Sequence, residues 1–193
     1  RPDRQLGGRP CRRGLSRRAV AGRGRRRAQA VCAELIICAA PAYLVRHGAP
    51  GNLNALATHR CSVFRRPRTG TLMPWYVKVE DSTVEHHVVP TLCVNDEVLE
   101  TEAVLAGHVL GLLTGVAAAP HIRAGRLVPL LTAHVADRSS AFVYYGSRTA
   151  QPARVTAFID LAVRRLLNNP AYVLTAKELQ SAEAKGRKQY PRQ

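Results

Sequence analysis

Short apolar runs of strand length alternate with amphipathic segments of helix length from Ala33 to about residue 167. Residues 34–39 (ELIICA) form a continuous run with β-branched side chains, a pattern typical of a strand that is buried on both faces. Pro41 suits the first turn of the short helix that follows, and His47 and Gly48 suit its end. The alternation predicts an α/β fold with a mostly parallel or mixed sheet covered on both faces.

The same periodicities predict the remaining elements. Residues 75–79 and 84–88 are expected to form a hairpin around a polar turn. In the helix expected at residues 96–106, Val98 and Leu99 are among the apolar positions of the buried face. Further strands are expected at residues 61–65, 91–94, 110–113, 126–131 and 141–145, and further helices at residues 52–58, 116–122, 152–167 and, briefly, 175–184.

Positive charge is concentrated at the start of the chain. The formal net charge is +16, and residues 1–30 supply +10 of it through eleven arginines and a single acidic residue, Asp3. This head has no apolar periodicity, so it buries too little surface to offset the entropy lost on ordering. We expect it to be disordered or a non-native leader, because arginine without lysine is typical of GC-rich DNA read outside its native frame. Such an arm also suits nonspecific contact with nucleic-acid phosphates.

Several classes of site and location have no support in the sequence. Five cysteines, at positions 11, 32, 38, 61 and 93, include no Cys-x-x-Cys pair and no histidine partners at metal spacing, so no metal, cofactor or disulfide framework is indicated. No run reaches the eighteen or so apolar residues of a spanning helix, so we expect a cytoplasmic protein without membrane contact. Gly-x-Ser-x-Gly and Gly-x-Gly-x-x-Gly motifs are absent, so an enzyme is not expected.

The most informative pattern lies in residues 94–131. Asn95 and Asp96 open a helix, Leu105-Ala106-Gly107 ends it, and a short apolar strand precedes residues 122–129 (IRAGRLVP). In this register the chain closely resembles the effector-binding domain of LysR-type transcriptional regulators, over about residues 33–167. That domain has two Rossmann-like lobes joined by two crossing strands, as in periplasmic binding proteins, with a small effector in the cleft between the lobes.

The resemblance implies a domain organisation. ELIICA would be the first crossing strand, residues 140–148 (SAFVYYGSR) the return strand, and the helix within residues 151–166 the closing helix of the first lobe. Family members begin with a helix-turn-helix and the first half of the first lobe, which are not visible ahead of Ala33, so truncation at the N-terminus is expected. The predicted divisions are an Arg-rich disordered or non-native leader (1–32), an effector-binding domain (33–170) with the second lobe at about 40–135 and a remnant of the first lobe at 136–170, and a charged C-terminal tail (171–193).

Candidate binding residues follow from strand ends. In open α/β sheets ligands bind beyond the carboxyl ends of the strands, and the resemblance places the second lobe's share of the effector cleft there. Two arginines at such an end suit a carboxylate effector. Structural roles are the alternative, since Asp96 also suits a helix cap, Pro41 a helix start, and the arginines a solvated loop. The predicted ligand-binding residues are Ala40, Pro41, Phe64, Arg65, Arg66, Asn95, Asp96 and Tyr145.

The function implied by the resemblance is that of the ligand-sensing and oligomerisation region of a LysR-type transcriptional regulator. Its partners would be a small-molecule effector, further copies of the chain in intact relatives, and DNA only through a helix-turn-helix that this sequence lacks. Two alternatives stay open. One is a stand-alone small-molecule binding module of the periplasmic-binding-protein type. The other is a nonspecific nucleic-acid binder that acts through its arginine-rich head, which deletion of residues 1–30 would test.

Overall fold

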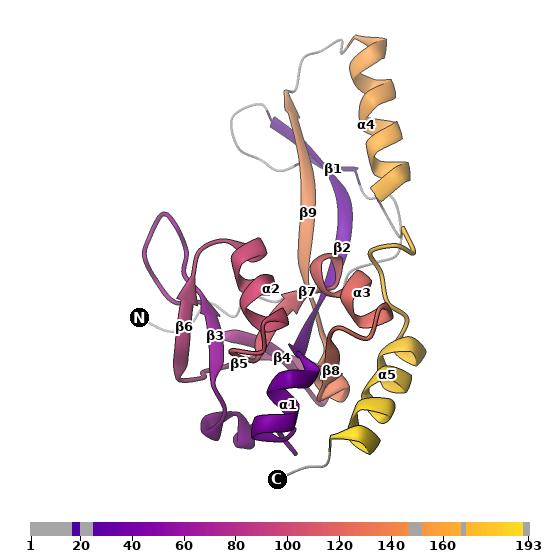
Figure 1. Cartoon of the computed structure of the whole chain (residues 1–193). Helices are drawn as coiled ribbons and strands as arrows, with labels where there is room; N and C mark the ends of the chain where they lie inside the picture. Colours follow the sequence, from indigo (N-terminus) through magenta and orange to yellow (C-terminus); the bar gives the residue numbers. More distant parts are fainter. Residues whose placement is uncertain (1–16, 20–24, 147–151, 167–168, 191–193) are drawn as a thin grey trace.

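Two long antiparallel strands, β2 (Arg25–Ala39) and β9 (Ala136–Gly146), run out of an α/β lobe (Figure 1). The structure, a computed structural model, describes residues 17–19, 25–146, 152–166 and 169–190. The far half of the two strands carries the short strand β1 (Arg17–Ala19) on one edge and is flanked by the helix α4 (Ala153–Leu166). The chain therefore has a periplasmic-binding-protein-like arrangement of one lobe, two crossing strands and part of a second lobe.

The sheet of the lobe is mixed, as the sequence predicts. The end of β2 pairs antiparallel with β7 on one edge and with β8 on the other. On the far side of β7, a parallel bridge between Cys61 and Leu110 adds β3, which pairs in parallel with β6. The strand order across the lobe is therefore β6-β3-β7-β2-β8. These strands are β3 (Cys61–Phe64), β6 (Pro90–Val94), β7 (Gly111–Thr114) and β8 (Val128–Leu130).

Side chains that alternate along the end of β2 enter two separate hydrophobic clusters. Ile37 and Ala39 belong to one cluster, whereas Ile36 and Cys38 belong to the other. Because successive strand residues point to opposite faces, both faces of the sheet are buried, as the continuous apolar run predicts. The elements that cover them include α1 (Pro41–His47), η1 (Asn54–Thr58), α2 (Glu97–Leu105) and α3 (Gly115–Arg123).

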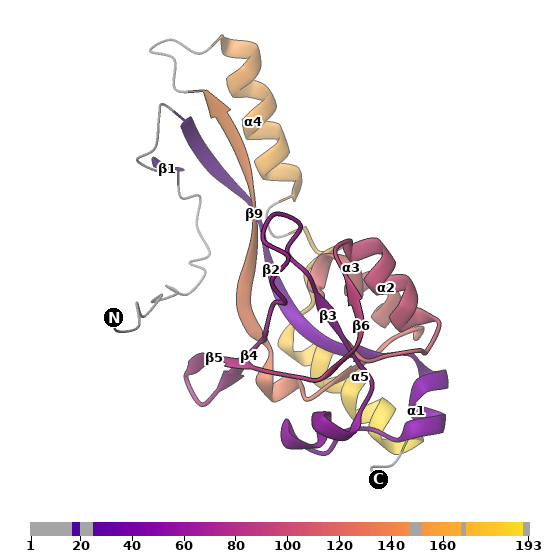
Figure 2. The ribbon, with the colours of Figure 1, turned by 90° about the vertical axis from the view of Figure 1, so that its left-hand side faces the viewer.

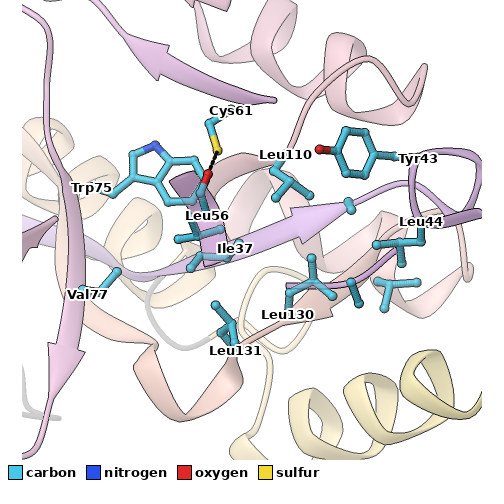
Figure 3. Packing of buried hydrophobic residues seen from close by; sticks show 13 residues of the cluster. Ile37, Tyr43, Leu44, Leu56, Cys61, Trp75, Val77, Leu110, Leu130 and Leu131 are labelled. Atoms are coloured by element: carbon cyan, nitrogen blue, oxygen red, sulfur yellow. Dashed lines mark hydrogen bonds between the residues drawn. The ribbon is translucent and has the colours of Figure 1, made fainter. Parts of the chain in front are cut away.

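One cluster joins the sheet to the neighbouring hairpin. Figure 3 shows Ile37, Leu56 and Trp75 gathered close to β2, and Trp75 is 2% exposed. Trp75 begins the hairpin of β4 (Trp75–Val79) and β5 (Ser82–His86), which Figure 2 shows at the edge of the lobe. Its turn is tighter than predicted, because β5 starts at Ser82, and Glu80 takes a left-handed φ of 53° there.

The arginine-rich head departs from expectation where it is described. Arg25 and the residues after it belong to β2, in which the segment from Arg25 to Leu35 pairs with β9. Residues 25–32 thus form strand structure through backbone pairing with β9, and β1 does so through pairing with β2, although this part of the chain has no apolar periodicity of its own. Residues 1–16 and 20–24 lie outside the described residues. The crossing part of β2 thus precedes ELIICA, whose end lies in the sheet of the lobe.

The predicted apolar face of α2 is wrong at Val98 and Leu99, whereas Ala103 and Leu105, the other predicted apolar positions, pack against the core. Val98 is 68% exposed and Leu99 is 61% exposed, whereas Glu100, Thr101 and Val104 are buried. A carboxylate on the buried face is unusual, and its hydrogen bond with a buried serine is described below.

The C-terminal segment is a docked helix and not only a charged tail. Helix α5 (Ala176–Gln189) starts with a capping box between Thr175 and Glu178, and it lies beside β8 (Figure 1). Leu174 and Leu179 are buried in the cluster that also contains Ile36. The sequence predicts only residues 175–184 as briefly helical, and the helix is longer because it packs on the lobe through buried leucines.

Candidate functional site

A cavity of about 450 Å³ lies at the carboxyl ends of the parallel strands of the lobe. Phe64 comes from the end of β3, Thr114 from the end of β7, and Leu35 from the part of β2 where pairing passes from β9 to β7. The cavity therefore opens where the crossing strands leave the lobe. Its complete lining is Leu35, Phe64, Arg66, Met73, Pro74, Trp75, Tyr76, Glu97, Glu100, Leu112 and Thr114.

An ordered loop brings a guanidinium group to this cavity. After β3, the backbone N–H of Met73 donates to the carbonyl of Phe64 at 2.8 Å, and the N–H of Arg66 donates to that of Thr71 at 2.9 Å. Gly70 closes the loop with a left-handed φ of 69°, a conformation that glycine adopts without steric cost. The loop is thus a short extension of β3 that is closed by its own backbone hydrogen bonds. It holds the exposed Arg66 at the cavity wall.

Two helix starts contribute Glu97 and Thr114 to the lining. Asp96 is the N-cap of α2, and its carboxylate accepts hydrogen bonds from the N–H groups of Val98 at 2.8 Å and Leu99 at 3.0 Å. Thr114 is the N-cap of α3, and its hydroxyl also donates to a carboxylate oxygen of Glu97 at 2.5 Å. This hydrogen bond ties the starts of the two helices together beside the cavity.

A buried polar group lies in the lining. Glu100 is 5% exposed, and its carboxylate accepts a hydrogen bond from the hydroxyl of the fully buried Ser62 at 2.5 Å. The indole N–H of Trp75 donates to the backbone carbonyl of Ser62 at 3.0 Å, which places Trp75 next to this pair. Burial raises the pKa of Glu100 above its usual value, repulsion by Glu97 raises it further, and the hydrogen bond from Ser62 lowers it. The wall is therefore apolar with one buried carboxyl group.

The structure brings together some of the predicted binding residues. Phe64 and Arg66 line the cavity. Arg65 is next to them, but its backbone N–H is bonded to the carbonyl of Val94 at 2.6 Å and its side chain is not in the lining. Asn95 is exposed beside the start of α2, and Asp96 acts as a helix cap, the structural alternative considered above.

The other predicted residues lie elsewhere. Ala40 and Pro41 follow β2, which runs antiparallel to β7, so they lie at the opposite end of the sheet from Thr114. The premise that all these strand ends share one edge is therefore wrong for β2. Pro41 occupies the first position of α1, its structural alternative. On β9, Tyr145 pairs with Arg26, roughly 30 Å along the strand from Ala136, the partner of Leu35, at about 3.3 Å per residue.

Sequence reasoning missed Trp75, Glu97, Glu100 and Thr114. Thr114 had a usable signal, because it ends a strand and precedes a helix, as Asn95 does. Glu100 had none, since a glutamate in the first turns of a helix is usually explained by the helix dipole. Trp75 reaches the cavity through the loop after β3, a tertiary contact that local patterns do not reveal.

The described part of the chain contains neither a cluster of metal ligands nor a helix suited to the membrane. Within residues 17–19, 25–146, 152–166 and 169–190, no group of three or more His, Cys, Asp or Glu side chains is arranged to hold a metal ion. None of the helices described there combines the length and apolar character needed to span a bilayer.

Comparison with protein families identifies the fold. The family model for the LysR substrate binding domain matches residues 27–167. The chain belongs to this family. The match begins inside β2, so it covers residues that the sequence analysis assigns to the leader, and it ends before α5.

Relatives of this LysR substrate-binding domain are transcriptional regulators. The HTH-type transcriptional regulator CrgA of Neisseria meningitidis serogroup C is 29% identical over 135 residues, 69% of this chain and 44% of CrgA. The uncharacterized HTH-type transcriptional regulator YcaN of Escherichia coli K12 is 31% identical over 127 residues, 66% of this chain and 41% of YcaN. The chain thus spans less than half the length of these relatives.

Solved structures agree with the fold of this LysR domain. The regulatory domain of CrgA from Neisseria meningitidis superposes with a TM-score of 0.62 at 26% identity, covering 74% of this chain and 70% of that one. The regulatory domain of AphB from Vibrio vulnificus superposes with a TM-score of 0.60 at 20% identity, covering 73% and 70%. The second likeness supports the fold alone.

Proposed function

We propose that this chain is the ligand-sensing region of a LysR-type transcriptional regulator and that a small-molecule effector binds in the cavity beside Leu35. The observation that carries the proposal is the position of the cavity, at the carboxyl ends of β3 and β7 and against the crossing strand. Its volume of about 450 Å³ is in the range of small-molecule sites, and its walls are largely apolar with a few polar groups.

A ligand in this position is suited to shift the orientation of the lobes. Leu35 lies where β2 leaves the lobe, so a ligand that contacts Leu35 favours one arrangement of the crossing strands over another. Differential affinity for two arrangements is what a population shift requires. In the intact regulator, that shift changes how the DNA-binding heads of paired copies meet the operator, and the protein acts in the cytoplasm, where the DNA is.

The exposed guanidinium of Arg66 at the wall suits a carboxylate on the effector. The relatives that match the chain are regulators, which does not favour a stand-alone binding module. The pairing of residues 25–35 with β9 likewise does not favour a free basic arm as the functional part of the molecule.

Trp75 provides the readout that tests the proposal. It is the single tryptophan of the chain and lines the cavity, so a bound ligand changes its fluorescence. We expect a panel of aliphatic and aromatic carboxylates to include compounds that quench this emission saturably. Arg66→Ala should weaken their binding about tenfold, the effect of losing one charge-assisted hydrogen bond.

Arg68→Ala is the matched control, because Arg68 is exposed in the same loop but does not line the cavity. It should leave the affinity unchanged. If neither the carboxylates nor a wider panel of small metabolites alters the emission of Trp75, the cavity is not an effector site and the proposal is wrong.

A further inference from the structure

Glu100 is the polar group of the cavity that the proposed function leaves unexplained. It is 5% exposed, it lines the cavity, and the hydrogen bond from Ser62 occupies one of its oxygens. A carboxylate has about four acceptor sites, so one donor leaves most of its capacity unused. Burying such a group is costly unless a partner compensates for the lost water.

The surroundings of Glu100 supply no compensating cation. Among the ion pairs found in the described part of the chain, none includes Glu100. The charge that affects its pKa is that of Glu97, which is of the same sign. The cavity lining therefore contains two carboxyl groups, those of Glu97 and Glu100, and one guanidinium group, that of Arg66. The chain as a whole, in contrast, is strongly basic.

The side chains that line the cavity around Glu100 indicate the chemical character of the rest of the ligand. Phe64, Met73, Trp75, Tyr76 and Leu112 present aromatic and aliphatic side chains to the same space. Such walls bind an apolar body mainly through the area that it removes from water. The buried carboxyl is thus suited to one donor group on an otherwise apolar molecule.

We propose that the effector carries a primary amine, which binds against Glu100 with an apolar or aromatic body along the wall formed by Phe64 and Trp75. This inference rests on the proposed function, because it names the chemical class of the ligand of the same cavity. An ammonium group supplies both the missing countercharge and the missing donors, and charge-assisted hydrogen bonds are the strongest available to a buried carboxylate. Arg66 then serves an anionic group on the same molecule.

Two probes with the same phenylpropyl group, one an amine and the other an alcohol, test whether the cavity prefers an amine. We would titrate the full chain with 3-phenylpropylamine and with 3-phenylpropan-1-ol at pH 7.5, and follow the emission of Trp75. The amine should bind about tenfold more tightly than the alcohol, since a hydrogen bond between an ammonium group and a carboxylate is stronger than one from a neutral hydroxyl.

Substitutions on α2 test whether the preference for the amine depends on Glu100. Glu100→Gln keeps the size of the side chain and an acceptor for Ser62, so it should reduce amine affinity about tenfold and leave the alcohol unchanged. Glu102→Gln is the matched control, because Glu102 is an exposed glutamate of the same helix outside the cavity lining, and it should keep the preference. Circular dichroism of each variant checks that the fold is intact.

Three results would overturn the inference: no amine binding at millimolar concentration, equal affinity for the two probes, or an amine preference that survives Glu100→Gln. In each case the carboxylate panel decides separately whether the cavity binds effectors. A carboxylate that quenches Trp75 in an Arg66-dependent way would leave the proposed function standing while the amine is rejected.

Discussion

Glu100 of α2 and Glu183 of α5 are both buried glutamates, and their surroundings are unlike each other. Glu100 is 5% exposed and accepts a hydrogen bond from Ser62, whereas Glu183 is 8% exposed and accepts from three donors on the turn after β8. Arg187 in addition forms an ion pair with Glu183. The first group lines a cavity, and the second is enclosed by protein.

The contacts of Glu183 explain why α5 docks on the lobe. Its carboxylate accepts from the backbone N–H of Leu131 at 3.0 Å and of Thr132 at 3.2 Å, and also from the hydroxyl of Thr132. Leu131 has a left-handed φ of 51°, which is unfavourable for a leucine. The carboxylate of Glu183 thus provides the hydrogen-bond acceptor for backbone N–H groups of this turn, which lies at the start of η2 (Thr132–His134).

The number of hydrogen bonds that a buried carboxylate accepts within the protein thus distinguishes a structural role from a role in ligand binding. Glu183 uses its acceptor capacity within the protein, so its removal should damage the fold. Glu100 keeps unused capacity beside a cavity, so its replacement should change binding more than stability. Stability measurements on the two regions therefore test the assignment without knowledge of the effector.

The largest effect is expected for Glu183→Ala. This change leaves the N–H of Leu131 buried without its acceptor and removes the partner of Arg187, so it should lower the free energy of unfolding by about 3 kcal/mol. Urea unfolding, followed by Trp75 fluorescence and circular dichroism, measures the loss. Gln180→Ala, at an exposed position of the same helix, should change stability by less than about 0.5 kcal/mol. Equal effects of the two changes would show that α5 contributes nothing through Glu183.

Gly186→Ala tests the same docking by steric means. A Cβ atom at this position would lie 2.3 Å from Cγ1 of Val128, although alanine favours a helix by about 1 kcal/mol over glycine. The steric clash with Val128 should outweigh the gain in helix propensity and lower the free energy of unfolding by about 2 kcal/mol. In a Val128→Ala background the clash is absent, so Gly186→Ala should then be neutral or stabilising. Persistence of the full loss in that background would mean that α5 does not lie against β8.

The comparison also shows how far the sequence predicts this molecule. The alternation of apolar runs predicts the strands and helices of the lobe, because the periods of burial are local properties. Phe64 and Arg66 were found from the strand-end rule, since β3 is parallel to its neighbours. Ala40 and Pro41 were misplaced because the direction of β2 relative to β7 is a tertiary property.

Polar side chains were harder to place than apolar ones. Residues 171–193 were predicted to be a charged tail, because the helix owes its position to Glu183 and to two buried leucines spread along a hydrophilic segment. The capping box of Thr175 and Glu178 was the available signal for its start. Val98 and Leu99 were assigned to the core, whereas Glu100 is there, because its partner Ser62 lies in a distant strand.

The smallest effect on stability is expected for Glu100→Gln, and it depends on pH. Burial and repulsion by Glu97 raise the pKa of Glu100 above the usual 4.5, so the folded protein holds this proton more tightly than the unfolded chain. The associated stability is complete below pH 4.5 and is lost as the pH rises through the raised pKa of the folded state. Glutamine has no such proton and still accepts from Ser62, so at pH 7 the variant should be as stable as the parent or more stable, by about 1 kcal/mol at most.

Urea unfolding at a series of pH values from 4 to 8 measures this trend. The stability of Glu100→Gln relative to the parent should increase with pH, whereas Glu102→Gln, the exposed control on the same helix, should not reproduce the increase. A relative stability that decreases with pH would mean that the fold already stabilises the ionised carboxylate. Glu100 would then be satisfied internally, as Glu183 is, and the cavity would have no need of a cationic ligand at that position.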